Sequence, residues 1–178
     1  MMKKRSVLFL AAFAFMAFAI PAQAQTTLYI AGGATFPTGD FGDSSVGWMG
    51  AGGVIFGLGD GGFGVGGEVF YGQNSYSDLD GAKTTPYGVM AIADYTFGTE
   101  GNLRPYVFGG AGLMVHRFSY EGFSDSESAF GYQAGAGLSF PIGLFVEGRF
   151  MGSASMGEGE DSGTTTFFAA MAGWAFGL

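Results

Sequence analysis

Residues 130–150 read FGYQAGAGLSFPIGLFVEGRF, and apolar side chains recur at every second position on both sides of a short, proline-containing turn. The positions between them include polar residues such as Gln133, Glu147 and Arg149. Because successive side chains of a β-strand point to opposite faces, this alternation predicts strands with one apolar face and one polar face. The stretch therefore predicts two antiparallel strands joined by a tight turn.

The same alternation extends from this hairpin in both directions and defines eight segments of about ten residues each. The connections between them are alternately long and short, which is typical of an up-and-down meander. Ten residues at about 3.3 Å each, tilted by about 40°, span about 25 Å, the height of the apolar band of an outer-membrane barrel. The expected strands are 27–36, 48–58, 63–71, 86–97, 104–116, 129–140, 143–152 and 165–178, with long connections at 37–47, 72–85, 117–128 and 153–164.

The two faces of the eight expected strands differ in charge. One face is apolar and uncharged throughout. A soluble barrel, or a lipocalin-like binder, would turn that face inward and coat its exterior with charges. The other face has too few charges for an exterior, so we expect it to line a narrow lumen while the apolar face meets lipid. The ionisable residues on this polar face are Glu68, Asp94, Arg104, His116, Glu147 and Arg149.

The composition favours β structure and excludes several classes of partner. The chain has 178 residues, 35 of them Gly, with 17% aromatic residues and no Cys. Glycine is costly inside helices, which disfavours a helical protein. The formal net charge of −8 argues against nucleic acid as a partner, because phosphate contacts need clustered Lys and Arg. Without Cys, neither a disulfide nor a thiol-ligated zinc site can form.

The first 24 residues have the organisation of an export signal. Three basic residues at positions 3–5 precede an apolar run over 7–20, and Ala22-Gln23-Ala24 matches an A-x-A cleavage site. The apolar run is shorter than the roughly 20 residues of a membrane-spanning helix. We therefore expect a signal peptide over residues 1–24 and an outer-membrane barrel domain over residues 25–178.

Three stretches resemble a known family: residues 104–112 (RPYVFGGAG), 131–140 (GYQAGAGLSF) and 144–150 (LFVEGRF). They are similar to strands of the small eight-stranded outer-membrane β-barrels, the OmpA-like transmembrane domain and the OmpX-like proteins. The resemblance implies an all-β fold, an eight-stranded antiparallel up-and-down transmembrane β-barrel. It also implies location in the cell outer membrane of a Gram-negative-type cell.

The end of the chain carries a second point of resemblance. Trp174, Phe176 and Leu178 are apolar at alternate positions and resemble the C-terminal assembly signal of these barrels, with Leu where an aromatic residue is usual. This implies contact with the outer-membrane assembly machinery. Outer-membrane lipid and lipopolysaccharide are the other partners that the resemblance implies.

Five charged residues of the polar face are expected to meet in the lumen. An unpaired charge in a confined interior costs several kcal/mol, so we expect these side chains to form a structural network that fills the lumen. The alternative is a narrow channel for ions or small solutes. The five residues are Glu68, Asp94, Arg104, Glu147 and Arg149.

His116 is the single histidine and lies at the far end of the fifth expected strand. A lipid A-modifying barrel enzyme is therefore a further alternative, with His116 as its base. Such catalysis needs a hydroxyl on the same face, within hydrogen-bond reach of the imidazole. Ser119 lies three residues away and so faces the other side of the strand. Ser128 comes from another strand, and geometry allows it to supply the hydroxyl.

No motif predicts a cofactor or a specific metal site. Gly57-x-Gly59-x-x-Gly62 matches a dinucleotide-binding pattern in letters, but an alternating strand rather than a helix follows it. The acidic residues of the expected outer loops match no calcium-loop spacing. We therefore expect a non-catalytic barrel with a structural, membrane-integrity or surface-interaction role, whose surface ligand the sequence leaves open. The outer-loop acids are Asp40, Asp43, Asp78, Asp80, Glu121, Asp125, Glu127, Glu158, Glu160 and Asp161.

Overall fold

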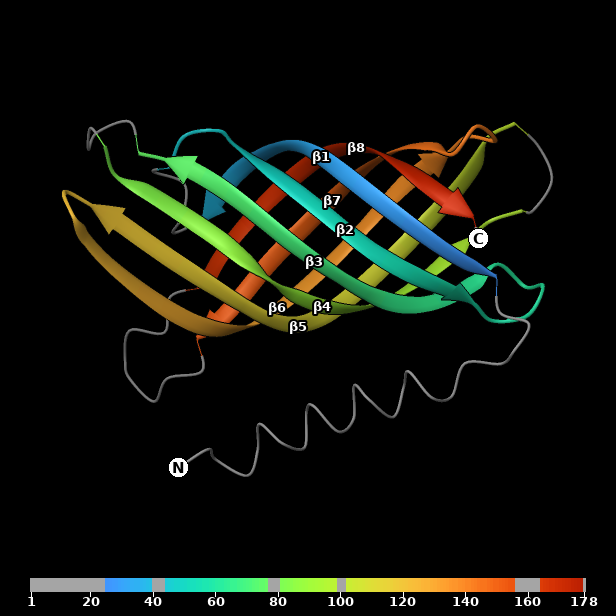
Figure 1. Ribbon diagram of the computed structural model, residues 1–178, viewed down its shortest axis with the longest axis horizontal. Coiled ribbons are helices and arrows are strands. Elements are labelled where there is room, and N and C mark those ends of the chain that lie inside the picture. The colour runs from blue at the N-terminus through green and yellow to red at the C-terminus, as the bar shows by residue number, and fades with distance from the viewer. Residues whose placement is uncertain (1–24, 40–43, 77–80, 99–101, 156–163, 178) are drawn as a thin grey trace, which may run out of the picture.

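The computed structural model describes residues 25–39, 44–76, 81–98, 102–155 and 164–177, and these form a closed barrel of eight antiparallel strands (Figure 1). The expected signal peptide, residues 1–24, lies outside this description and stays a prediction. No helix in the described part of the chain is long and apolar enough to cross a membrane. The strands are β1 (Thr26–Gly39), β2 (Gly47–Gly57), β3 (Phe63–Ser75), β4 (Lys83–Thr96), β5 (Arg104–Tyr120), β6 (Phe123–Ser139), β7 (Leu144–Ser155) and β8 (Thr164–Gly177).

Each strand pairs with the next along the chain, and β1 closes the barrel against β8. The closing register runs from Thr27 opposite Gly177 to Gly39 opposite Thr165. The expected up-and-down meander is therefore confirmed. Figure 1 shows that β1 begins and β8 ends at the same end of the barrel, which we call the terminal end. The opposite end, where β5 turns into β6, is the hairpin end.

The apolar faces of the strands point outward. Ile30 on β1 is 61% exposed and Val69 on β3 is 59% exposed, although both lie in the middle of their strands. Large apolar side chains are normally buried in a protein surrounded by water. The exterior therefore suits hydrocarbon, as the alternation predicts. Other outward-facing apolar residues include Leu28, Val89, Val107, Leu113, Val146 and Phe168.

Aromatic side chains border this apolar exterior near both ends of the barrel. Towards the hairpin end, the ring centroids of Trp48 and Tyr71 are 5.8 Å apart, and those of Tyr71 and Tyr87 are 6.4 Å apart. Towards the terminal end, Tyr95 and Phe97 form an edge-on pair at 4.9 Å. Such girdles occur where a barrel exterior passes from hydrocarbon to headgroups.

The expected connection over residues 117–128 is wrong. β5 continues to Tyr120, β6 begins at Phe123, and both strands have 17 residues, against 11 to 14 in the others. The turn between them consists of Glu121 and Gly122, with φ values of 46° and 86°. Two successive positive φ values are the mark of the type I′ hairpin turn. The sequence SDSES over 124–128 lacks an apolar face, so it reads as a loop, although the strands continue beyond the apolar band.

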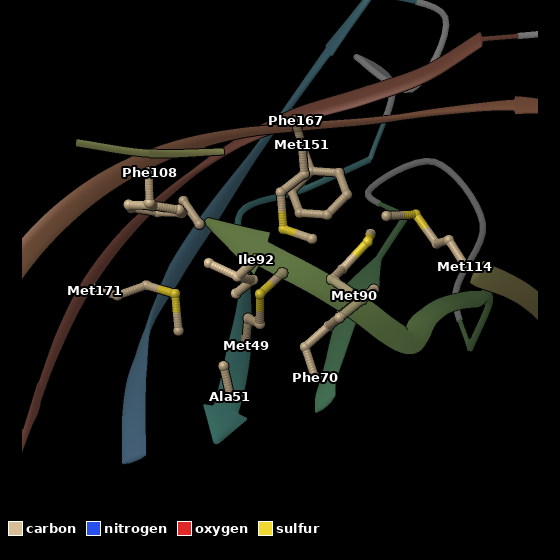
Figure 2. Packing of buried hydrophobic residues seen from close by; sticks show 11 residues of the cluster. Met49, Ala51, Phe70, Met90, Ile92, Phe108, Met114, Met151, Phe167 and Met171 are labelled. Atoms are coloured by element: carbon tan, nitrogen blue, oxygen red, sulfur yellow. The ribbon is translucent and has the colours of Figure 1, made fainter. Parts of the chain in front are cut away.

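Buried methionine and phenylalanine side chains pack together in the interior between the strands (Figure 2). On β3, Phe70 lies two residues beyond Glu68 towards the hairpin end, and on β7, Met151 lies two residues beyond Arg149. Part of the apolar filling therefore lies on the hairpin-end side of the charged residues, whereas Ile92 and Phe108 line the interior beside Asp94 and Arg149. The methionines and phenylalanines of the cluster that are at most 4% exposed are Met49, Phe70, Met90, Met114, Met151, Phe167 and Met171.

A charge placed on the outward face should oppose folding in a bilayer. We expect Val69→Arg to lower the free energy of unfolding by about 2–4 kcal/mol, the cost of Arg at the midplane of a membrane barrel. The measurement is urea unfolding of the barrel refolded into phospholipid vesicles. The matched control is Val46→Arg, since Val46 is equally exposed but precedes β2 at the hairpin end. Equal effects of the two changes would contradict an exterior surrounded by lipid.

Candidate functional site

Arg149, on β7, lies at the centre of the polar interior and is 2% exposed. Its Nη1 donates to Oε1 of Glu68 on β3 at 2.7 Å and to Oε1 of Gln133 on β6 at 3.1 Å. Its Nε donates to Oε1 of Glu147 at 2.9 Å, and its Nη2 forms a second ion pair with the same oxygen. One guanidinium thus serves two carboxylates, one from its own strand and one from across the lumen.

Two tyrosines complete the hydrogen bonding of these carboxylates. The hydroxyl of Tyr29 on β1 donates to Oε2 of Glu68 at 2.8 Å, and that of Tyr106 on β5 donates to Oε2 of Glu147 at 2.7 Å. Nε2 of Gln133 donates to Oε1 of Glu68 at 3.1 Å. Every carboxylate oxygen of the pair therefore has a donor. We call this group the lumen network, and its members are Tyr29, Glu68, Tyr106, Gln133, Glu147 and Arg149.

The lumen network connects β1, β3, β5, β6 and β7 through their inward side chains. The guanidinium carbon of Arg149 also lies 5.1 Å from the ring centroid of Phe108, a cation–π distance. Neither tyrosine is among the residues predicted for the lumen, because only charged residues of the polar face were expected to meet there. A signal existed, since Tyr106 shares its face with Arg104, two residues away on the same strand.

Asp94 and Arg104 face the interior as expected but do not join the lumen network. Both ion pairs among the described residues belong to Arg149. One oxygen of Asp94 and Nε of Arg104 are buried with no hydrogen-bond partner in the described structure. Both residues line a cavity of about 420 Å³ at the terminal end, which also reaches Tyr106 and Arg149. The sequence correctly predicted the face of these two residues, but not their separation from the network.

His116 has a hydroxyl partner that the sequence did not indicate. Its Nε2 lies 2.8 Å from Oγ of Ser153 on β7, and Ser153 is 2% exposed. Its Nδ1 is buried with no hydrogen-bond partner in the described structure. Glu127 is its register partner on β6. Ser128 is paired with Val115, is exposed and faces the other side.

The remaining expected sites are only partly within the described residues. Trp174 and Phe176 are exposed on the outer face of β8, while Leu178 lies outside the description, so the assembly signal stays a prediction. No cluster of three or more His, Asp or Glu that could hold a metal ion is found among the described residues. Of the ten outer-loop acids, those at 40, 43, 78, 80, 158, 160 and 161 lie outside the description.

A closed eight-stranded barrel with an apolar exterior, aromatic girdles and a polar group sealed inside defines the class of small outer-membrane β-barrels. The chain belongs to the family described as outer membrane protein beta-barrel domain, whose model matches residues 6–176. It is thus an outer-membrane protein of the Gram-negative cell surface, as expected. Among curated proteins, none is similar enough in sequence to match the chain.

Solved structures of the same fold have low sequence identity to this chain. Neisserial surface protein A is 14% identical with a TM-score of 0.65, covering 86% of this chain and 97% of its own. The N-terminal barrel domain of Pseudomonas aeruginosa OprF is 20% identical with a TM-score of 0.55, and the match covers 86% of this chain and 100% of the OprF domain. The outer membrane enzyme PagL is 17% identical with a TM-score of 0.54, and the match covers 83% of this chain and 98% of PagL. These likenesses show the fold, which surface proteins and an enzyme share.

Removing the cation of the lumen network should destabilise the barrel. We expect Arg149→Met to lower the free energy of unfolding by about 3–5 kcal/mol, because two carboxylates then face each other without a counter-charge. Combining it with Glu68→Gln and Glu147→Gln should recover much of that loss. The measurement is urea unfolding in vesicles, with Arg117→Met as the control because Arg117 is exposed. If the triple variant were less stable than Arg149→Met alone, charge pairing would not be the cause.

Proposed function

We propose that this protein is a non-catalytic structural barrel that supports the integrity of the outer membrane and makes surface contacts through its β5–β6 hairpin. The observation that carries this proposal is the filled interior. Beyond the cavity at the terminal end, the lumen network and the buried methionine and phenylalanine side chains occupy the space that a solute would need to cross the barrel. An eight-stranded barrel has an interior just wide enough for side chains to fill.

The hairpin supplies the surface for contacts. It extends past the point where the pairing of β6 with β7 begins, at Ala129 opposite Ser155. Phe123 is 66% exposed at its tip, next to the turn. An exposed aromatic side chain on a rigid strand pair is a common anchor for a protein partner. These features support surface interaction without identifying the partner.

The integrity role can be tested in a strain that lacks the protein. We expect greater sensitivity to detergent, restored by the full chain and by a variant in which Asn-Gly replaces residues 117–126, because this change keeps the barrel and joins the paired residues His116 and Glu127. Survival in detergent is the measurement. The mobility of unboiled and boiled samples on gels controls for the amount of folded barrel. If the strain without the protein survived detergent as well as the wild type, the proposal would be contradicted.

The channel alternative makes a separate measurement decisive. It requires unitary conductance of the purified barrel in a planar bilayer. We expect none, because ions would have to cross the buried apolar side chains. Conductance steps that change in Glu147→Ala or Arg149→Ala would replace the structural proposal with a narrow channel.

The contact between His116 and Ser153 favours one second candidate, an ester hydrolase acting on lipid at the hairpin end. In that reaction Ser153 Oγ attacks the ester carbonyl, His116 Nε2 takes its proton and returns it to the leaving alcohol, and water then releases the acid. The burial of Ser153 makes this the second candidate, since its hydroxyl is covered in the structure.

A covalent probe separates the two candidates. A hydrolase would react with a fluorophosphonate at Ser153, and the label would disappear in Ser153→Ala and in His116→Ala. For a structural barrel we expect no labelling of the wild-type protein above the level of Ser153→Ala. Mass spectrometry of the labelled peptide is the measurement. Specific labelling at Ser153 would overturn the non-catalytic assignment.

A further inference from the structure

Basic residues are few beyond residue 24, and they are divided between the inside and the outside of the barrel. The four are Lys83, Arg104, Arg117 and Arg149, against 15 acidic residues. Arg104 and Arg149 line the interior. Lys83 and Arg117 are both exposed, on the neighbouring strands β4 and β5. In so acidic a chain, the juxtaposition of the two outer bases needs an explanation.

The register places Lys83 and Arg117 diagonally across one strand pair. Lys83 is opposite Ser119, and Arg117 is opposite Thr85. Diagonal neighbours of an antiparallel pair lie about 7–8 Å apart on the same face, within joint reach of two long side chains. Towards the terminal end, the same face continues to Tyr87, which stacks with Tyr71 in the aromatic girdle. The two bases therefore lie just beyond the apolar band, at the level of lipid headgroups.

The hairpin sorts its polar residues between its two faces. Opposite residues of an antiparallel pair share a face. Arg117 is opposite Ser126, and Ser119 is opposite Ser124, so serines continue the basic face across β6. The acids Asp125 and Glu127 alternate with these serines and so lie on the other face, that of His116. The pattern of 124–128 therefore places the two carboxylates of this segment on the face opposite Arg117.

We propose that a phosphate group of an outer-leaflet lipid binds on this outward face, between Lys83 and Arg117. A guanidinium offers two parallel donors to phosphate oxygens, an ammonium adds a point charge, and hydroxyl groups such as that of Ser119 can donate to the remaining oxygens. Nη2 of Arg117 already donates to Oγ of Ser124 at 3.3 Å, which holds the guanidinium on this face. A hollow lined by Tyr71, Thr85, Tyr87, Arg117 and Ser119 lies at the same place.

The choice of a lipid phosphate rests on the position of the face and on the proposed function, which places the hairpin end outside the cell. Tyr71 and Tyr87 are exposed on the membrane side of the bases, where they can contact acyl chains. A soluble anion would gain nothing from this apolar border. The lipid anion of the outer leaflet that combines phosphate with several acyl chains is the lipid A portion of lipopolysaccharide.

The test uses the full barrel, purified in maltoside micelles, with diphosphoryl lipid A as the probe and native mass spectrometry to count retained lipid. We expect the double variant Lys83→Gln/Arg117→Gln to bind the probe about tenfold or more weakly, the effect of losing charge-assisted hydrogen bonds. Lys83→Arg/Arg117→Lys should retain binding, because the charges remain. Asp125→Asn, on the opposite face, is the matched control and should leave binding unchanged.

Three results would overturn the proposal. One is equal retention of dephosphorylated lipid A by the wild-type barrel. Another is competition by inorganic phosphate at the same concentration as the lipid, which would indicate a site for a free anion. The third is binding that persists in the double Gln variant and disappears with EDTA, which would place the phosphate on cation-bridged carboxylates. The assay needs no cells, so its failure and a failure of the membrane-integrity role can be told apart.

Discussion

Hydrocarbon offers no hydrogen-bond partner to a peptide group, and the architecture of this protein depends on that constraint. A sheet with two free edges would leave a row of N–H and C=O groups exposed to lipid at each edge, at a cost of several kcal/mol per group. The pairing of β1 with β8 removes both edges. Once the backbone is satisfied within the sheet, the outward side chains need only be apolar, as Ile30 and Val69 are.

The same constraint determines what the interior must do. With apolar residues turned outward, polar residues are left on the inner face, where little water can solvate them. Arg149 meets this condition by serving Glu68 and Glu147 together, while tyrosine hydroxyls supply the remaining donors. The hydrogen bonds reach strands that are not neighbours in the sheet. The lumen network therefore connects opposite sides of the barrel, in addition to the backbone hydrogen bonds between neighbouring strands.

The sequence predicts the faces of the strands well because a period of two is decided by local backbone geometry. Glu68 and Val69 are adjacent in sequence, and the structure turns one inward and the other outward. The contacts between inward residues depend instead on the stagger of strands that are distant in sequence. No local sequence pattern predicts this stagger. Glu68 and Arg149 are 81 residues apart and form an ion pair, whereas Asp94 has the same alternation and stays outside the network. The contact of His116 with Ser153 depends on stagger in the same way.

The wrong prediction at residues 117–128 shows that the alternation of side chains along a strand continues beyond the apolar band of the barrel. Within the apolar band, alternation means apolar outside and polar inside, and this contrast makes a strand visible in the sequence. Beyond the band both faces meet water or polar headgroups, so the contrast between serine and acid over 124–128 is the alternation that remains. A hydropathy pattern cannot detect it, because all five residues are polar. A charge pattern can, since the carboxylates of Asp125 and Glu127 share one face and leave the opposite face to Arg117. The limit of the apolar pattern therefore marks the edge of the lipid and not the end of the strand.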